Sequence, residues 1–476
     1  MNASRARAPG ARDTASADPH TSASPDATAS PRDINIVGAG LAGALLAVLL
    51  ARRGLRITLY DRRPDPRQAT AVGGRSINLA LAARGIRALE RAGVMDRIRP
   101  LLIPMRGRMV HDLSGSVTLQ PYGQREHEVI HSVSRAALNR VLIEEAACYD
   151  TVTLRFEQTC VGASIEHNTL RWRNNTDGTE YETALTPTIA TDGAGSAVRT
   201  SLTATKHLIV GEDWLDHDYK ELTIPAQAGR HVMDGNSLHI WPRGGFMLIA
   251  LPNTDGSFTA TLFLARTGTN SFAALTDATA VNAFFQREFP DVVPLMPNLA
   301  QEFQAHPQGQ LGTVQLTPWH IGGNVLLLGD AAHAIVPFHG QGMNAAFEDC
   351  SVLDTLLDEI GTDWEPLFTA FSNSRRPNAA AIATMALENY TEMRDTVRDA
   401  GFVRRKAIAM ELERRFPERF IPRYSMVMFH PEIPYAEALR RGTLQEGILL
   451  QLDAQRDASG HINTALAQEL ITERLT

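Results

Sequence analysis

Residues 33–61 read DINIVGAGLAGALLAVLLARRGLRITLYD, and this stretch decides the fold class of the chain. Its opening apolar run predicts a short buried strand. Gly38, Gly40 and Gly43 follow in G-x-G-x-x-G spacing and lead directly into an apolar segment typical of a buried helix. A glycine ends that helix, and a second apolar run predicts another buried strand that ends at Asp61. The stretch therefore predicts the strand–helix–strand unit of a doubly wound α/β fold.

Each part of this unit suits a dinucleotide. The first two glycines let the backbone turn tightly and approach a pyrophosphate, and Gly43 lets the helix lie close to the strand. The free N–H groups and partial positive charge at the helix N-terminus attract phosphates. Asp61 stands where an acid meets ribose hydroxyls, which favours NAD or FAD over NADP. The alternative is a glycine-rich turn inside an α/β core.

Composition excludes several classes of function. The 476 residues carry a net charge of −7 without a Lys/Arg block, so nucleic acid is not expected as a partner. The three cysteines form no C-x-x-C pair, which argues against a disulfide framework and predicts a reducing, cytoplasmic location. The longest apolar run, LAGALLAVLLA, is too short for a membrane span, which needs about 20 residues.

The first residues, 1–31, are rich in Ala, Ser, Pro and Asp. Such a segment buries too little apolar surface to offset the entropy of ordering, so a disordered tail is expected. A targeting peptide is the alternative, but three aspartates and the lack of an apolar core segment argue against it.

A second stretch, VLLLGDAAHAIVPFHGQGMNAAFEDC at 325–350, contains enough His, Asp, Glu and Cys for a metal site. His333 and His339 are six residues apart with a proline between them, so they cannot share one helix face. No metal is therefore expected. His333 and Cys350 are expected to pack in the core, and the Glu348–Asp349 pair to be exposed or to support its helix.

The backbone of this stretch suggests another role. Asp330 ends a predicted strand, where it can hydrogen-bond a polyol chain. A glycine-rich turn then starts a helix at 342–344, whose N–H groups would stabilise the negative charge of a reduced flavin. Pro337 would hold the intervening loop beside the flavin ring. Asp192, in ATDGAG, ends another predicted strand, and Arg75 follows soon after the first unit.

The three motifs, GxGxxG, DG and GD, resemble those of the single-component FAD-dependent aromatic hydroxylases. The resemblance runs from about residue 33 to about residue 434 through long strings such as GRSINLAL, PMRGRMVHD, LHIWPRGGFMLIALPN and GDAAHAIVPFHGQGMNAAFEDC. These strings are most similar to members that hydroxylate L-kynurenine at ring position 3. The resemblance thus implies non-covalent FAD, with NADPH and O2 as co-substrates and a flavin C4a-hydroperoxide as the oxidant.

The resemblance also implies residue roles. Five side chains would hold an amino-acid substrate, with Arg108 binding its carboxylate: Arg108, Tyr122, His339, Asn389 and Tyr424. His339 departs from the family, since many relatives have an aromatic residue there. The motifs and the resemblance together assign sixteen residues to FAD: Gly38, Gly40, Leu41, Gly43, Asp61, Arg62, Arg75, Ala80, Arg135, Cys160, Asp192, Asp330, Pro337, Gly342, Met343 and Asn344.

The expected fold is α/β (α+β), with a Rossmann-like FAD-binding domain, an inserted β-sheet domain for the substrate and a C-terminal helical region. The aromatic and branched residues between 221 and 263 predict the inserted strands. The expected boundaries are 32–105, 130–205 and 310–360 for the FAD-binding domain, 106–129 and 206–309 for the substrate domain, and 361–476 for the helical region.

Several alternatives remain open at this level. The chain shows no second glycine motif, so NADPH is expected to dock transiently in a groove. Animal members of the family carry a C-terminal membrane segment, and none is expected here. The oligomeric state is open, with a homodimer among the alternatives. Rival functions are a hydroxylase of phenols, an epoxidase, and a non-catalytic protein of related fold; an amino-acid clamp would argue against the first two and an intact GD motif against the third.

Overall fold

The computed structural model describes residues 33–68, 78–396, 399–457 and 460–475. The predicted tail at 1–31 and the predicted cofactor residue Arg75 lie outside these ranges. Within them, no helix combines the length and the apolar character that a bilayer span requires.

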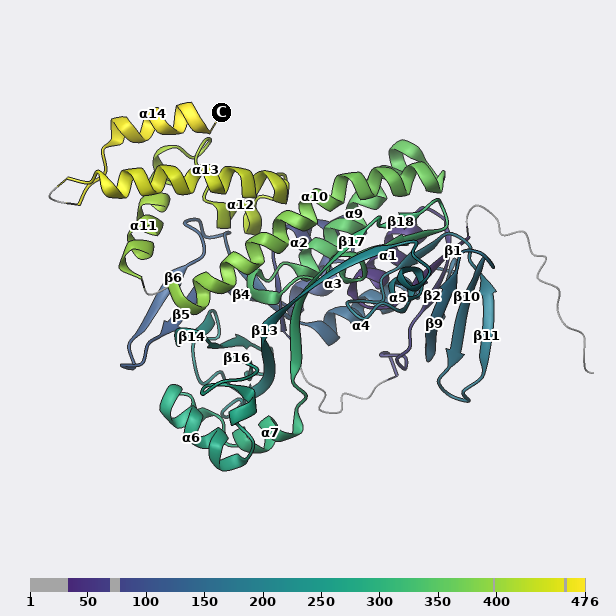
Figure 1. Cartoon of the computed structure of the whole chain (residues 1–476), viewed down its shortest axis with the longest axis horizontal. Helices are drawn as coiled ribbons and strands as arrows, with labels where there is room; N and C mark the ends of the chain where they lie inside the picture. Colours follow the sequence, from purple (N-terminus) through teal and green to yellow (C-terminus); the bar gives the residue numbers. More distant parts are fainter. Residues whose placement is uncertain (1–32, 69–77, 397–398, 458–459, 476) are drawn as a thin grey trace, which may run out of the picture.

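A mostly parallel sheet contains the strands that precede the three glycine-bearing motifs (Figure 1). In the described chain it has six strands in the order β18-β19-β12-β1-β2-β8, and only β18 runs antiparallel to its neighbour. Its strands come from three distant segments of the sequence: β1 Asp33–Val37, β2 Arg56–Tyr60, β8 Val152–Arg155, β12 Thr188–Ala190, β18 His320–Ile321 and β19 Val325–Leu327.

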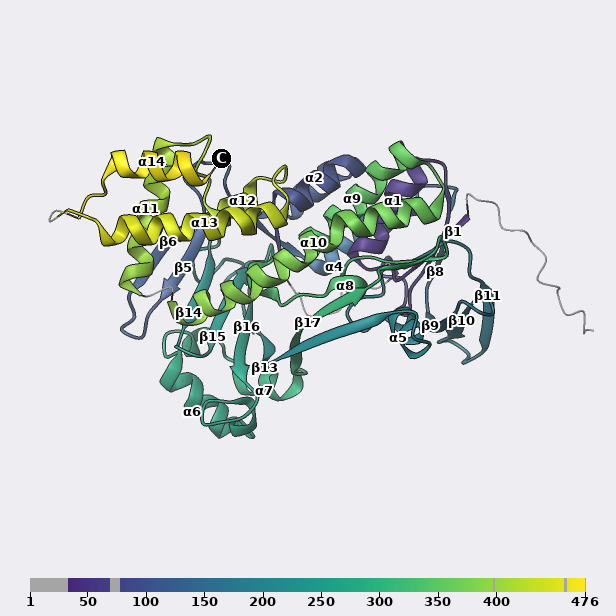
Figure 2. The ribbon, with the colours of Figure 1, turned by 45° about the horizontal axis from the view of Figure 1, so that its top comes forward.

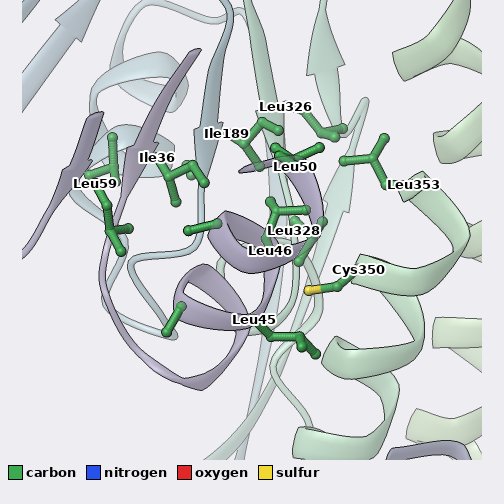
Figure 3. Packing of buried hydrophobic residues seen from close by; sticks show 14 of the residues in the cluster. Ile36, Leu45, Leu46, Leu50, Leu59, Ile189, Leu326, Leu328, Cys350 and Leu353 are labelled. Carbon is green, nitrogen blue, oxygen red and sulfur yellow. The ribbon is translucent and has the colours of Figure 1, made fainter. Parts of the chain in front are cut away.

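Helix α1 (Leu41–Arg52) packs on this sheet because almost its whole surface is apolar. Leu45, Leu46 and Leu50 have no exposed surface. Figure 3 shows them between side chains of β1, β2, β12 and β19 on one side and helix α9 (Gly342–Ile360) on the other. Cys350 of α9 lies in this core, as expected, and its sulfur is 3.4 Å from the Ala42 carbonyl oxygen.

The G-x-G-x-x-G glycines are required where the turn meets its neighbours. A Cβ on Gly43 would lie 1.9 Å from the carbonyl oxygen of Gly38. Gly38 itself has φ +102°, and a Cβ there would lie 2.7 Å from the Thr191 carbonyl oxygen. Both positions therefore exclude any side chain.

An antiparallel sheet with one parallel pair, β14 with β5, forms a second layer, in the order β17-β13-β16-β15-β14-β5-β6. Helices α6 and α7 lie against it (Figure 1), and Trp241 and Phe258 of the sheet are buried in one cluster with Phe285 of α6. The bounds are β5 Gly107–His111, β6 Val117–Pro121, β13 Ile209–Ile224, β14 Leu238–Pro242, β15 Met247–Pro252, β16 Phe258–Ala265, β17 Gly309–Thr317, η2 Phe272–Ala274, α6 Ala278–Glu288, η3 Val293–Leu295 and α7 Leu299–Ala305.

Two smaller sheets complete the strands described. One has the order β11-β10-β9 and lies at the end of the molecule opposite the C-terminal helices (Figure 1); the other has the order β3-β7-β4. Their strands, with the helices near them, are β3 Asn78–Leu81, α2 Ala83–Ala92, α3 Met95–Ile98, η1 Arg99–Leu101, β4 Ile103–Met105, β7 Ile130–Ser134, α4 Arg135–Ala146, β9 Gln158–Ser164, β10 Thr169–Asn174, β11 Glu180–Ala184 and α5 Ala197–Ala204.

The C-terminal part is helical (Figure 2). The long helix α10 begins at Trp364 and runs beside α9 toward α11–α14, which gather at one end of the molecule. The remaining bounds are α8 Asp330–His333, η4 Pro337–His339, α10 Trp364–Thr391, the π-helical turn η5 Glu392–Thr396, α11 Ala400–Arg415, α12 Arg423–Phe429, α13 Tyr435–Ala454 and α14 Thr464–Arg474.

One expectation about α9 is wrong in part. Asp349 is fully buried rather than exposed, and its carboxylate accepts hydrogen bonds from His333 Nε2 and Arg375 Nε, each at 2.6 Å. Glu348 bonds Arg84 at 2.6 Å and Arg375 at 2.7 Å. Burial is possible because these partners from other elements neutralise both carboxylates. His333 is buried, as expected, but as a partner of Asp349.

Replacing Gly43 by alanine is expected to lower the free energy of unfolding by about 1–3 kcal/mol, because the added methyl overlaps backbone atoms. Denaturant unfolding of the ligand-free protein, followed by circular dichroism, measures this. Gly40→Ala is the matched control, since a Cβ there meets no atom within 4 Å. Equal losses in the two variants would contradict the close approach.

Candidate active site

The three glycine-bearing turns meet at one edge of the parallel sheet. Val37 of β1 is in register with Ala190 of β12, and Ala190 with Leu327 of β19. The strands run parallel, so their carboxyl ends open in the same direction, where ligands bind in such sheets. Thr191 Oγ1 also donates a hydrogen bond to the Gly38 carbonyl at 2.8 Å, which joins the first two turns directly.

The start of α1 is available to an anionic ligand. Gly40 is its N-cap, and no side-chain hydrogen bond caps the helix. A Cβ on Gly40 would enter open space, so a ligand can approach this backbone closely, beside Leu41. The loop itself is fixed from outside: Asn139 Nδ2 donates to the Ala39 carbonyl at 3.0 Å, and Ala39 N donates to Asp61 at 2.9 Å. This geometry fits the pyrophosphate of a dinucleotide.

Asp61 follows β2 directly, as predicted, and is buried. Burial would raise its pKa, but the hydrogen bonds and charge of Arg63, with the backbone N–H of Ala39, lower the pKa below its ordinary value. The carboxylate is therefore ionised and in place to accept hydroxyl hydrogens. Arg63 contacts this carboxylate at 2.8 Å, and Arg62, which the sequence assigns to FAD, is exposed beside it.

Asp330 begins α8 directly after β19 and faces the start of α9. A Cβ on Gly342 would lie 4.0 Å from its carboxylate. The side chain keeps surface accessible to solvent, yet desolvation by the surrounding protein raises its pKa, against the charges of His333 and Arg135. A carboxyl group that is surrounded by protein but still accessible can bind the hydroxyl groups of a ligand. Arg135, the first residue of α4, is close enough for its positive charge to act on the carboxyl group of Asp330.

The start of α9 is held against β3. Asn344 Nδ2 donates to the carbonyls of Ala80 and Gly340, each at 2.8 Å, and its Oδ1 accepts from Ala82 N at 2.9 Å. No side-chain bond caps this helix either, so its first N–H groups can stabilise negative charge on a ligand. Met343 is half-buried next to them.

Three further residues are assigned to the cofactor by the sequence. Asp192 follows β12 and accepts from Ala197 N at 2.8 Å, while burial raises its pKa. Cys160 is buried on β9; burial and the nearby charge of Asp192 raise the pKa of its thiol to about 12. The thiol is therefore protonated and unreactive. Pro337 is exposed at the start of η4.

Five predicted substrate residues come together from four elements and the loop after β6. Arg108 of β5 is 5% exposed, which excludes a surface salt bridge. The centroids of the Tyr122 and Tyr424 rings lie 5.9 and 5.2 Å from its guanidinium carbon, and the two rings stack at 5.7 Å. Arg108 Nη2 is 3.4 Å from Asn389 Oδ1. A buried planar cation beside two stacked aromatic rings suits a carboxylate.

The fifth residue, His339, connects this cluster to the start of α9. It lies on η4, and its ring stacks on Tyr424 at 5.4 Å. Burial lowers its pKa to about 3, with repulsion from Arg108 adding to the effect, so the ring is neutral at physiological pH. Its Nδ1 is buried and has no hydrogen-bond partner within the described chain, which leaves that nitrogen available to a ligand.

Two residues of the cluster escaped sequence analysis. Glu392 Oε1 accepts from Arg108 Nη1 at 3.1 Å, and Lys406 lies beside both. All three line a cavity of about 180 Å³ between the β5–β6 hairpin and α11–α13. Glu392 is three residues after Asn389, which is the spacing of neighbours on one helix face and was a usable signal. Lys406 has no local signal, because it reaches the cluster through the packing of α11.

Comparisons with known proteins agree with this geometry. Residues 32–386 match the family model described as FAD binding domain. The chain is 48% identical to the kynurenine 3-monooxygenase of Stenotrophomonas maltophilia over 447 residues, covering 93% of this chain and 97% of the relative. It is 45% identical to the kynurenine 3-monooxygenase of Myxococcus xanthus over 444 residues, covering 93% and 95%.

Solved structures share the fold at lower identity. One is the tetrameric form of 2-methyl-3-hydroxypyridine-5-carboxylic acid oxygenase, with a TM-score of 0.62, 19% identity and coverage of 77% of this chain and 93% of that one. Another is Pseudomonas aeruginosa PqsL in complex with 2-aminobenzoylacetate, with a TM-score of 0.61, 22% identity and coverage of 78% and 99%.

Gly40→Val is expected to weaken FAD binding by about tenfold or more, because the side chain fills the open space at the start of α1. The stability of the ligand-free protein should stay close to that of the wild type. Flavin fluorescence titration measures binding, and thermal unfolding of apoprotein measures stability. Wild-type affinity for FAD in this variant would show that the pyrophosphate lies elsewhere.

Proposed function

The chain belongs to the family of the kynurenine 3-monooxygenases, FAD-dependent enzymes, and we propose that it hydroxylates L-kynurenine at ring position 3. The overall reaction is L-kynurenine + NADPH + H⁺ + O2 → 3-hydroxykynurenine + NADP⁺ + H2O. Bound FAD supplies the redox chemistry, carrying electrons from NADPH to O2. The relatives that cover 93% of the chain support the substrate class.

The observation that carries the proposal is the buried guanidinium of Arg108 among Tyr122, Asn389 and Tyr424. A phenol has no carboxylate for this cluster to bind, so a phenol hydroxylase is not favoured. An amino acid has both a carboxylate for Arg108 and an ammonium group for Glu392, which is 3.1 Å from Arg108. The amino-acid head of kynurenine therefore matches the charges of the cluster.

The η4 turn connects the residues proposed to bind the amino-acid head with those proposed to contact the flavin. The carbonyl of Phe338 accepts a hydrogen bond from Asn389 Nδ2 at 2.6 Å, and Asn344 reaches the same turn through the Gly340 carbonyl. The Phe338 ring stacks on Tyr390 at 3.9 Å and meets Phe263 at 4.9 Å. These contacts supply an apolar wall that excludes water from a reactive site.

We assign no general base. The aniline ring of kynurenine is electron-rich. Its hydroxylation beside the amino group therefore requires that the protein position the ring and exclude water, rather than remove a proton from the substrate. The neutral ring of His339 suits such a site, because a charged imidazole would add a further cation beside Arg108 and Lys406. NADPH is proposed to dock transiently, and the described residues leave the oligomeric state open.

The central experiment measures NADPH oxidation and product mass with and without L-kynurenine. Kynurenine should stimulate oxidation, and 18O2 should place one labelled oxygen in 3-hydroxykynurenine. Arg108→Lys is expected to raise KM by about 30-fold or more, because an ammonium cannot replace two parallel hydrogen bonds. Turnover of phenols without any response to kynurenine would reassign the substrate.

Lys406 gives a pH-dependent prediction. Burial lowers its pKa to about 8, repulsion from Arg108 contributes, and Glu392 opposes the shift. A bound carboxylate favours the charged lysine, so affinity should fall as the pH rises through about 8, where that charge is lost. Titration with 4-oxo-4-phenylbutanoate, which lacks an amine, should show a loss of about threefold to fivefold between pH 7 and pH 9.

Lys406→Met is the control for this titration. It removes the titrating group, so affinity for the same ligand should be lower at pH 7 and should vary little up to pH 9. The same slope in Lys406→Met as in the wild type would assign the pH dependence to another group.

A further inference from the structure

Arg84 of α2 is a buried cation outside the motifs assigned to FAD or substrate. Its side chain has no exposed surface. The guanidinium carbon lies 4.0 Å from the centroid of the Tyr435 ring. Its nitrogens donate to four backbone carbonyls at the C-terminal end of α12 and just beyond it: Val427, His430, Pro431 and Ile433. Arg84 therefore caps α12 from another part of the fold.

Helix α12 depends on such an anchor. It contains seven residues, whereas isolated helices shorter than about 12–15 residues are marginal in water. Its last carbonyl groups have no partners within the helix, and a cation at a helix C-terminus also interacts favourably with the helix dipole. The second residue of α12 is Tyr424, which stacks on Tyr122 and faces Arg108. The contacts of Arg84 at the C-terminal end of α12 therefore affect the position of Tyr424 at its N-terminal end.

The charge of Arg84 is balanced by Glu348 of α9, the helix whose first turn is assigned to FAD. Arg84 Nη1 donates to Glu348 Oε1 of α9 at 2.6 Å, and Glu348 also pairs with Arg375 at 2.7 Å. A fully buried charge is stable only with such partners. Glu348 lies on the same helix whose first turn contains Met343 and Asn344.

A second link joins the start of α9 to the C-terminal helices. Gln341, the N-cap of α9, has no exposed surface. Its Oε1 accepts from the Tyr435 hydroxyl at 2.7 Å, and its Nε2 lies 2.9 Å from Met428 Sδ of α12. Arg84 and Gln341 therefore contact the same tyrosine, one at the face of its ring and one at its hydroxyl.

We propose that Arg84 is a positioning residue for substrate recognition, which holds α12 and Tyr424 in fixed relation to the flavin-facing start of α9. The proposal rests on the proposed function for the identity of the ligand. Loss of the anchor shifts Tyr424, so the substrate binds less tightly and lies less well placed for hydroxylation. Arg84 contacts α9 at Glu348, beyond the first turn that is assigned to FAD, so the affinity for FAD is expected to stay close to that of the wild type.

The test uses the FAD-loaded full chain and Arg84→Lys, which keeps the charge but loses the planar fork. The Kd of L-kynurenine, from flavin absorbance titration, should rise about tenfold or more. The ratio of product formed to NADPH oxidised should fall, with hydrogen peroxide as the difference, while the FAD Kd stays within about twofold of the wild type.

Asp354→Asn is the matched control. Asp354 is a mostly buried acid of α9 that bonds Arg91 of α2 and Arg53, each at 2.5 Å, so it also ties α2 to α9 but does not contact α12. This variant should lose thermal stability yet keep the kynurenine Kd within about twofold of the wild type. An equal loss of kynurenine affinity in Asp354→Asn would overturn the proposal, because it would show a general effect of loosening α9.

Tyr435→Phe keeps the proposal testable if Arg84→Lys does not fold. It removes only the hydroxyl that bonds Gln341, and the expected rise in kynurenine Kd is about fivefold. Wild-type kynurenine affinity in Arg84→Lys would overturn the proposal. If Arg84→Lys does not fold, wild-type kynurenine affinity in Tyr435→Phe would overturn it. A wild-type protein that binds FAD but not kynurenine would instead reject the proposed function.

Discussion

The parallel pairing of β12 with β1 on one side and β19 on the other is the constraint on which the site depends. The last residues of these strands, Val37, Ala190 and Leu327, stand in register. Their turns must therefore open at the same edge, although they lie far apart in sequence. The buried leucines of α1 hold the three strands together from one face (Figure 3), so packing energy in the core fixes the geometry of the cofactor turns.

The stretch from Gly329 to Asn344 connects cofactor to substrate. It starts just after β19, continues through the η4 turn with His339, and ends in the first turn of α9. Asp349 fixes its beginning, since the carboxylate accepts a hydrogen bond from Gly329 N at 3.1 Å. The residues proposed to face the flavin and those proposed to face the amino-acid head thus lie in one continuous segment, and we expect a small shift of this backbone to alter both.

The strand–turn–helix geometry of the glycine-bearing turns could be predicted because its signals are local: glycine spacing, a helix start and a strand-end acid lie within short segments. The burial of Asp349 and the place of Lys406 beside Arg108 could not be predicted, because each depends on partners distant in sequence. The domain boundaries remain a proposal, supported by strands from three segments that form one sheet.

A crystal structure of the protein with FAD and L-kynurenine tests the central claim most directly. The account predicts one FAD that spans the turns at Gly40 and Asp330, with its ring beside the start of α9 and the kynurenine carboxylate on Arg108 in place of Glu392. FAD bound away from this strand edge, or a kynurenine carboxylate that does not contact Arg108, would contradict it.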